Sequence, residues 1–264
     1  MASNAVESHL SVVQSLLLPN EIITTDSAEY QQSIKTWTYQ KQQTPPIVVR
    51  PISEESLSRV VAYLYSTDLD LAIYGHGFMS ASAKDALINT SGFDLFYFDK
   101  QSETITIGAG QTWADVYRKL GEVAPEYGGK QPPTPHCHLE NYSDPKLTVR
   151  KVVGSRTPNV GIAGTIVTGG LSWLSTEYGC ISDPANMLDA KVVKYDGSAV
   201  WASTEPDLLW ALRGGGGGFG GKVTNTGPSL TWPDCIMHSN CRGCSSRLQI
   251  SSGHLGWFDP DTPE

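Results

Sequence analysis

Residues 46–77 read PIVVRPISEESLSRVVAYLYSTDLDLAIYGHG, and this stretch decides the fold. The β-branched run Ile47–Val49 predicts a strand, which Pro51 ends. Ser53 followed by two glutamates is typical of a helix start, because acidic side chains favour the first turn. Apolar residues then recur at helical spacing, as Leu57, Val60, Val61 and Leu64. Leu71–Tyr74 predicts a second strand that runs into a glycine turn, so the unit is strand, helix, strand and glycine loop.

A second strand-and-glycine pattern follows. Thr104–Ile107 alternates polar and apolar residues, which predicts a half-buried strand, and it runs into Gly108-Ala109-Gly110. Thr112 and Asp115 have the spacing of a capping box. The helix that they begin has an apolar face made of Trp113, Val116, Tyr117 and Leu120.

The remaining periodic segments mix strands and helices. Asp189–Tyr195 and Ser198–Ala202 predict a hairpin around the turn Asp196-Gly197. Asp207–Leu212 predicts a short helix, and residues 1–42 predict a polar N-terminal segment with one or two short helices. Because hairpins occur beside crossovers, the predicted class is α+β.

Composition excludes several kinds of protein. The chain has 264 residues, is 39% hydrophobic and carries a net charge of −8, which allows a real core and argues against nucleic acid as a partner. No apolar run is long enough for a membrane span. The start lacks the basic region of a secretory signal, and five scattered cysteines indicate no disulfide framework. We therefore expect a cytoplasmic protein.

Three glycine-rich segments each follow an apolar run: Gly75–Gly77, Gly108–Gly110 and Gly161–Gly170. Glycine leaves the backbone N–H open, and successive open N–H groups form an anion-binding nest. Loops of this kind that converge would suit a pyrophosphate, whereas each loop alone is more often an ordinary tight turn.

A fourth glycine cluster fits the pattern G-x-G-x-x-G at Gly215, Gly217 and Gly220. The dinucleotide fingerprint of that pattern follows a strand and opens a helix. Here a predicted helix precedes the glycines, so a Rossmann fold is not expected.

The order of these motifs resembles FAD-linked oxidases whose flavin domain is of the p-cresol methylhydroxylase (PCMH) or vanillyl-alcohol oxidase type. The resemblance is greatest to fungal members of the berberine-bridge-like branch, and it extends over residues 43–221 with one gap. The motifs that carry it are PIVVRP at 46–51, YGHG at 74–77, IGAG at 107–110, VGIAG at 160–164, GGLSWL at 169–174, EYG at 177–179 and DLLWALRGGG at 207–216.

The resemblance implies a fold, a cofactor and a set of contacts. It implies an FAD-binding domain of two α+β subdomains at 43–227, with the family's substrate domain absent from this chain. The cofactor-binding residues that we expect from the resemblance and the glycine turns are Tyr74, Gly75, His76, Gly77, Phe78, Gly108, Gly110, Val160, Gly161, Gly164, Gly169, Gly170, Tyr178, Gly179 and Val192.

Two departures from the family bear on how FAD would be held. Many relatives attach it covalently through a histidine at the position of Phe78, and some add a cysteine at the position of Thr157. Neither residue type is present, so we predict non-covalent FAD. For His76, hydrogen bonding to nearby backbone is the favoured role over covalent attachment.

Two segments lack the family pattern. Residues 130–151 interrupt it with a polar, proline-containing stretch, and the resemblance stops again after residue 221. Both begin with Gly-Lys, which can be encoded by GGTAAG, a sequence that contains a fungal 5′ splice signal. We therefore interpret 130–151 as an insertion and 222–264 as read-through, each from a retained intron, with 228–264 unstructured or aberrant.

The functional prediction is an FAD-dependent oxidoreductase that oxidises a small-molecule donor by hydride transfer, with reoxidation by oxygen. The catalytic base is unknown. The first alternative is a truncated FAD-binding fragment without catalysis. A zinc module built from Cys235, His238, Cys241 and Cys244 is a second alternative, disfavoured because the spacing is cramped, so no metal site is predicted.

Overall fold

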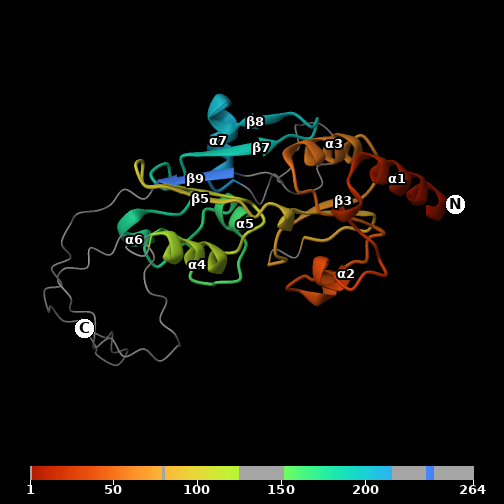
Figure 1. Cartoon of the computed structure of the whole chain (residues 1–264), viewed down its shortest axis with the longest axis horizontal. Coiled ribbons are helices and arrows are strands. Elements are labelled where there is room, and N and C mark those ends of the chain that lie inside the picture. The colour runs from red at the N-terminus through yellow and green to blue at the C-terminus, as the bar shows by residue number, and fades with distance from the viewer. Residues whose placement is uncertain (1, 79–80, 125–151, 216–235, 241–264) are drawn as a thin grey trace, which may run out of the picture.

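The computed structural model describes residues 2–78, 81–124, 152–215 and 236–240. They form two sheets with helices packed on them (Figure 1), which confirms the α+β class. No helix within these four ranges is long and apolar enough to cross a membrane.

The first sheet has the strand order β1-β2-β4-β3. Its strands are β1 (Ile22–Ile23), β2 (Ile47–Val49), β4 (Ala86–Asn89) and β3 (Leu71–Tyr74). The pairs β2–β4 and β4–β3 are parallel, and β1 is antiparallel to β2. β4 therefore lies between β2 and β3, which are consecutive strands in the sequence.

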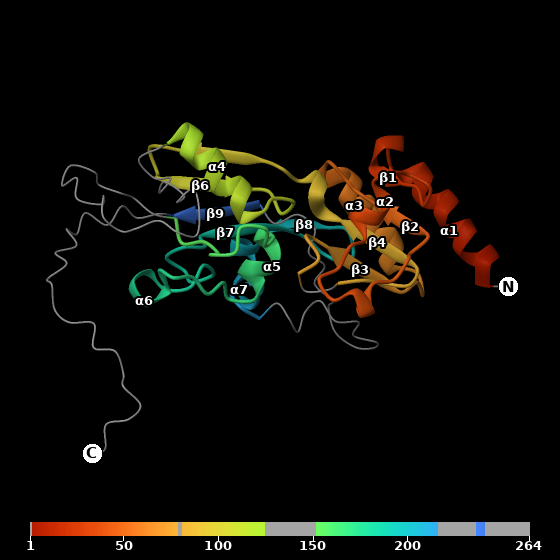
Figure 2. The ribbon, with the colours of Figure 1, turned by 90° about the horizontal axis from the view of Figure 1, so that it is seen from below.

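Helices cover both faces of this sheet (Figures 1 and 2). α1 (Ala2–Leu16) and α3 (Glu54–Tyr65) lie on one face, and the one-turn helix α2 (Tyr30–Ser33) lies on the other. Because side chains alternate along a strand, Ile47 and Val49 pack with α1 and α3, whereas Val48 packs on the opposite face. Ser53 caps α3 by accepting a hydrogen bond from the Ser56 N–H, as the sequence predicts.

The second sheet is antiparallel throughout, with the order β5-β6-β9-β7-β8. Its strands are β5 (Phe96–Asp99), β6 (Thr104–Ile107), β9 (Ile236–Asn240), β7 (Asp189–Val193) and β8 (Ala199–Trp201). The helices that accompany it are α4 (Trp113–Val123), α5 (Ile162–Val167), α6 (Ser175–Tyr178) and α7 (Pro206–Leu212).

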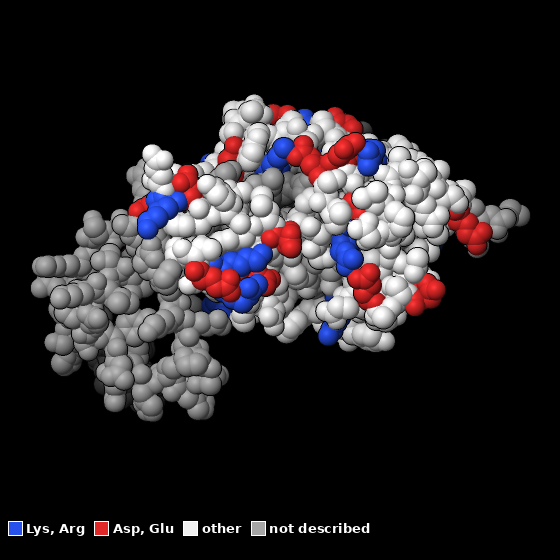
Figure 3. Space-filling model, in the orientation of Figure 1, with Lys and Arg blue, Asp and Glu red and all other residues white. Residues whose placement is uncertain are grey.

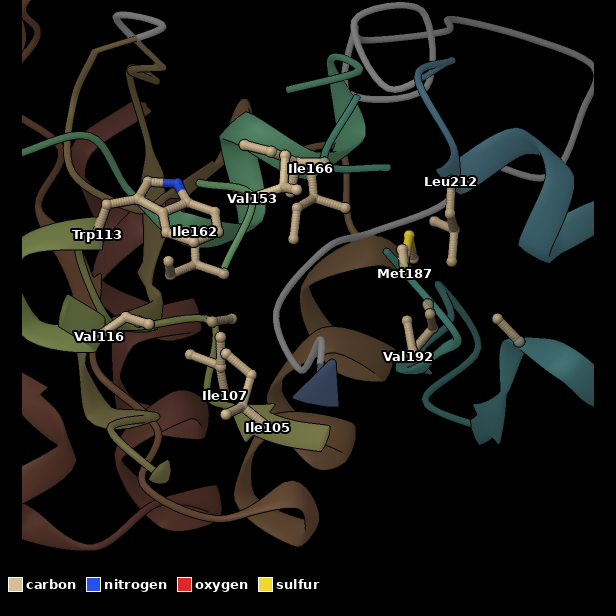
Figure 4. Packing of buried hydrophobic residues seen from close by; sticks show 14 of the residues in the cluster. Ile105, Ile107, Trp113, Val116, Val153, Ile162, Ile166, Met187, Val192 and Leu212 are labelled. Carbon is tan, nitrogen blue, oxygen red and sulfur yellow. The ribbon is translucent and has the colours of Figure 1, made fainter. Parts of the chain in front are cut away.

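One core joins this sheet to its helices (Figure 4). Ile105 and Ile107 of β6 pack with Trp113 and Val116 of α4, and Ile162 of α5 lies in the same cluster. The capping box of α4 is formed as predicted, with Thr112 accepting from the Asp115 N–H and Asp115 accepting from the Thr112 N–H. The sequence pattern therefore identified both the start and the buried face of α4.

β7 connects the two halves of the molecule. Val192 packs in the core of the second sheet, while the next residue, Val193, packs with α3 against the first. Lys191 forms an ion pair with Glu54 at the start of α3. The hairpin turn also approaches α3, since a Cβ on Gly197 would overlap the carbonyl oxygen of Ser58.

Three expectations need correction. The glycine-rich segment 161–170 is not only a loop, because its central part forms α5, with Gly164 inside the helix. The N-terminal 42 residues form more than a polar segment, because Val13, Ile23 and Ile34 are buried in the cores and β1 joins the first sheet.

The third correction concerns part of the tail 228–264, which was predicted to be unstructured or aberrant. Ile236–Asn240 forms β9 between β6 and β7. The rest of residues 216–264 and the segment 130–151 lie outside the described residues, as do three of the four residues of the zinc alternative.

Candidate functional site

The first glycine loop leaves the end of β3 and is clamped by the segment around Lys35. The Tyr74 hydroxyl donates to the Lys35 carbonyl oxygen at 2.7 Å, and the Trp37 N–H donates to the Gly77 carbonyl oxygen at 2.9 Å. Gly77 has φ +76°, and a Cβ there would overlap the Lys35 carbonyl oxygen. Only glycine fits this position, because both the conformation and the close approach exclude a side chain.

His76 joins this loop to the second one. Its Nε2 donates to the Gly110 carbonyl oxygen at a distance of 2.9 Å. The Gly110 N–H donates to the Phe93 carbonyl oxygen at 2.8 Å, which fixes the second loop against the end of the first sheet. The role favoured for His76 from the sequence, a hydrogen bond to nearby backbone, is the one that the structure has.

The third glycine segment meets the other two at the same place. A Cβ on Gly161 would lie 2.8 Å from Cδ2 of His76. The Ile162 N–H donates to the Gln111 carbonyl oxygen at 3.0 Å, and the Trp113 N–H donates to the Val160 carbonyl oxygen at 3.1 Å. The three glycine loops therefore converge around the His76 imidazole, although 34 residues separate His76 from Gly110.

Backbone donors remain open at this junction. Among the residues that the structure describes, the N–H groups of His76, Gly77 and Phe78 have no protein acceptor. Gln111 beside the second loop is buried, with its Oε1 also unpartnered. Buried or clustered polar groups without partners are uncommon in proteins, so the open N–H groups indicate a ligand that bears acceptors, whereas Gln111 Oε1 would require a donor.

Five glycines of the predicted site differ in what a side chain would meet. At Gly77, Gly108 and Gly110 a Cβ would overlap protein backbone, so these glycines serve the packing of the chain itself. At Gly164 and Gly169 a Cβ would meet no atom within 4 Å. These two border space that the described protein does not fill, although the Gly169 N–H and both carbonyl oxygens are already hydrogen-bonded within the protein.

The segment after α5 is folded on itself. The Ser182 hydroxyl donates to the Gly169 carbonyl oxygen at 2.9 Å, and the Ile181 N–H donates to the Gly170 carbonyl oxygen at 2.9 Å. Gly179 has φ +80° and faces the Asp183 carboxylate. Gly169, Gly170 and Gly179 therefore form one compact turn region that follows α5.

Two predicted residues have side chains that pack in or against the core of the second sheet, namely Val192 and Tyr178. Val192 is in β7, with its side chain in the core and Val200 as its strand partner. The Tyr178 carbonyl oxygen accepts a hydrogen bond from Asn186 Nδ2 at 2.9 Å. Sequence reasoning did not single out Trp37 or Gln111, because neither belongs to a motif or a periodic face.

Charges are mixed on the face of the molecule that Figure 3 shows. Lys and Arg side chains on the face shown in Figure 3 are interspersed with Asp and Glu and do not form a basic patch. Burial raises the pKa of the Tyr74 hydroxyl above its usual value, so Tyr74 stays a neutral donor to Lys35. No group of three metal-ligating side chains occurs in the described part of the chain.

The sequence profile of the FAD binding domain family matches residues 45–138. An FAD-dependent monooxygenase of Fusarium proliferatum is 30% identical over 192 residues, which are 70% of this chain and 32% of that protein. An FAD-linked oxidoreductase of Aspergillus terreus is 24% identical over 270 residues, covering 99% of this chain and 30% of that protein. The chain spans about a third of the length of these curated relatives.

Solved structures share the fold. Berberine bridge enzyme from Eschscholzia californica superposes with a TM-score of 0.65 at 21% identity, covering 88% of this chain and 42% of that one. Glucooligosaccharide oxidase from Acremonium strictum, described with a 6-S-cysteinyl, 8α-N1-histidyl FAD, gives 0.64 at 18% identity, covering 89% and 42%. The fold is thus the PCMH-type FAD-binding fold that the order of the motifs implied.

Proposed function

Because the chain has the fold of the PCMH-type flavoproteins and is related in sequence to FAD-linked oxidoreductases, we propose that it binds FAD without a covalent bond at its three glycine loops. The observation that carries this proposal is the convergence of the loops around His76, with open backbone N–H groups beside it.

The residues present fit a dinucleotide. The N–H groups of His76, Gly77 and Phe78 can donate to a diphosphate without a basic side chain. Gly164 and Gly169 leave unfilled space in which a cofactor can approach the backbone. The role of His76 is to hold the first and second loops in register, since its imidazole is already bonded to Gly110.

The residues at the two attachment positions of the family, Phe78 and Thr157, support non-covalent attachment. Phe78 stands where many relatives have a histidine, and a phenyl ring has no atom that can bond to a flavin. At the second position, Thr157 has no thiol, and its N–H donates to Ser155 Oγ at 3.2 Å. Affinity therefore depends on hydrogen bonds and packing alone.

We further propose that the protein oxidises a small organic donor. Bound FAD would supply the hydride acceptor and, once reduced, would pass its electrons to dioxygen. In this reaction we assign to the three glycine loops the roles of binding and orienting the cofactor and of shielding it from water. We assign no catalytic base, and the donor stays unspecified beyond a C–H or C–OH carbon.

Anaerobic mixing with donors tests the oxidoreductase proposal. FAD-loaded protein is mixed with alcohols, aldehydes and amines, and the oxidised-flavin absorbance is followed before and after air is admitted. The proposal expects at least one donor to bleach the flavin and air to restore its absorbance. If FAD binds but no donor bleaches it, the alternative of FAD binding without catalysis is supported instead.

A further inference from the structure

A pair of stacked aromatic rings lies beside the open N–H groups. The rings of Trp37 and Phe78 are 5.0 Å apart between centroids, with 19° between their planes. Phe78 is half-buried, but the Trp37 side chain is 74% exposed, so one of its faces packs on Phe78 and the rest faces solvent. The exposed face of Trp37 is therefore adjacent to the loop that carries the open N–H groups, because its own N–H is bonded to Gly77.

The pair is held rigidly despite its exposure. The Trp37 N–H donates to the Gly77 carbonyl oxygen, immediately before Phe78 in the chain. Two residues earlier, the Lys35 carbonyl oxygen accepts from the Tyr74 hydroxyl. Between them, Thr36 is buried, and its Oγ1 donates to the Thr38 carbonyl oxygen at 3.0 Å. The segment 35–37 and the loop 74–78 therefore form one unit with Trp37 on its outer side.

The other strongly exposed tryptophans differ from Trp37. Trp210 is 78% exposed on α7, whose C-terminal end adjoins Gly169 and not the loop 74–78, and Trp173 already has the Arg156 guanidinium 4.9 Å from its ring centroid. Trp37 alone among these three adjoins the backbone donors that the dinucleotide would use.

We propose that the exposed face of Trp37, supported from behind by Phe78, stacks on one planar ring of the bound dinucleotide. The inference rests on the proposed FAD site and adds a positioning residue to it. Flavin and adenine share the flat aromatic chemistry that such a face recognises, and stacking of this kind contributes about tenfold to affinity.

The test compares Trp37→Ala with Trp37→Phe and with the matched control Trp210→Ala. FAD affinity is measured by ultrafiltration, and flavin fluorescence is recorded at saturation. Trp37→Ala should weaken FAD binding about tenfold, Trp37→Phe should restore part of the loss, and Trp210→Ala should behave as the unsubstituted chain. Competition by FMN, which carries the flavin, and by ADP, which carries the adenine, then identifies the ring that stacks. Only the competitor whose ring stacks on Trp37 should bind more weakly to Trp37→Ala.

Two results would overturn the inference. One is an unchanged FAD affinity in Trp37→Ala. The other is a loss of FAD affinity that is not specific to the Trp37 ring. Such a loss would be equal in Trp37→Ala and Trp210→Ala, or would be explained by a lowered midpoint of urea unfolding. If the unsubstituted chain itself retains no FAD, the underlying site proposal has failed, which is a different outcome from either of these.

Discussion

Gly77 and Gly164 both belong to the predicted cofactor site, but the structure gives them different tasks. Gly77 adopts a left-handed conformation against the Lys35 carbonyl oxygen, whereas Gly164 lies in α5 with open space where a side chain would be. The sequence motifs mark both glycines equally, because a motif does not tell a glycine needed for packing from one needed for a ligand.

Alanine substitution should separate these two tasks. Gly77→Ala should lower the free energy of unfolding by about 2 kcal/mol or more, because it adds backbone strain to an overlap. Gly164→Ala should leave unfolding unchanged or raise its free energy by about 0.5–1 kcal/mol, since alanine favours a helix. Its Cβ should nevertheless weaken FAD binding.

Urea unfolding of the two apoproteins and FAD titration of Gly164→Ala check these expectations. An alanine at position 164 that binds FAD as tightly as glycine would show that the open space there is not part of the cofactor site.

Removal of the Glu21 side chain should be among the most destabilising substitutions in the first half of the molecule. Glu21 is completely buried, and its carboxylate accepts from the Leu18 N–H at 2.8 Å, the Ile52 N–H at 2.9 Å and the Ser56 hydroxyl at 3.1 Å. Glu21→Ala leaves these donors unpaired and should lower the free energy of unfolding by about 3 kcal/mol.

Glu55→Ala is the matched control. The Glu55 side chain is exposed and pairs with Arg59 one helical turn away, so its loss should change the free energy of unfolding by less than about 0.5 kcal/mol. Equal effects of the two substitutions in urea unfolding would refute the account of Glu21.

At the scale of elements, α4 and α5 show how far sequence patterns reach. α4 was predictable because its cap and its apolar face both lie within a dozen residues. α5 was read as a loop because four of the ten residues 161–170 are glycines. Gly161 precedes the helix, Gly164 lies inside it, and Gly169 and Gly170 follow it. Tertiary contacts of Ile162 and Ile166 with the core override the low helix propensity of Gly164.

The capping box of α4 offers a quantitative test. Thr112→Ala should lower the free energy of unfolding by about 1 kcal/mol, because the Asp115 N–H loses its acceptor. Asp115→Ala removes the reciprocal bond, and the double variant should cost less than the sum, since the two side chains also bond each other at 2.6 Å. Strict additivity in urea unfolding would contradict the box.

β9 was the least predictable strand, because nothing in the local pattern of 236–240 shows that β6 and β7 lie apart with room for it. It pairs with β6 over 104–107 and with β7 over 189–191. A chain ended after residue 227 should therefore unfold at lower urea and self-associate, because two strand edges lose their partner.

Urea unfolding and gel filtration of the shortened chain against the full one give the answer. Equal stability and an unchanged elution volume would show that β9 contributes nothing to the sheet, as the interpretation of the tail as aberrant expects.

At the scale of the whole molecule, the sequence predicted the α+β class and several of the elements, but neither β4 and β5 nor how the halves meet. The insertion of β4 between β2 and β3, and the packing of the β7–β8 hairpin on α3, depend on contacts between residues far apart in the chain. Periodicity reports which face of an element is buried and does not identify its partner.

Buried tyrosines in both halves should make the fold sensitive to alkali. Burial raises the pKa of Tyr65 to about 12 from 10.0, and it also raises the pKa values of Tyr74 and Tyr117. Since the folded state holds these protons more tightly, the stabilisation is complete below pH 10.0 and is lost as pH rises through the folded pKa values.

The free energy of unfolding should therefore stay level in mildly alkaline buffer and fall from about pH 10 towards pH 12, with a shallower fall in Tyr65→Phe. Urea unfolding at a series of pH values measures both slopes. A fall of the same steepness in Tyr65→Phe would show that this hydroxyl does not contribute.

The central claim is that the chain holds FAD at its converged glycine loops without a covalent bond. Its most direct test is to saturate the purified protein with FAD, remove the excess by gel filtration, and then precipitate the polypeptide with acid. The account predicts one FAD per chain after gel filtration and complete release of that flavin into the acid supernatant. A protein that retains no FAD, or flavin that stays with the precipitate, would contradict it.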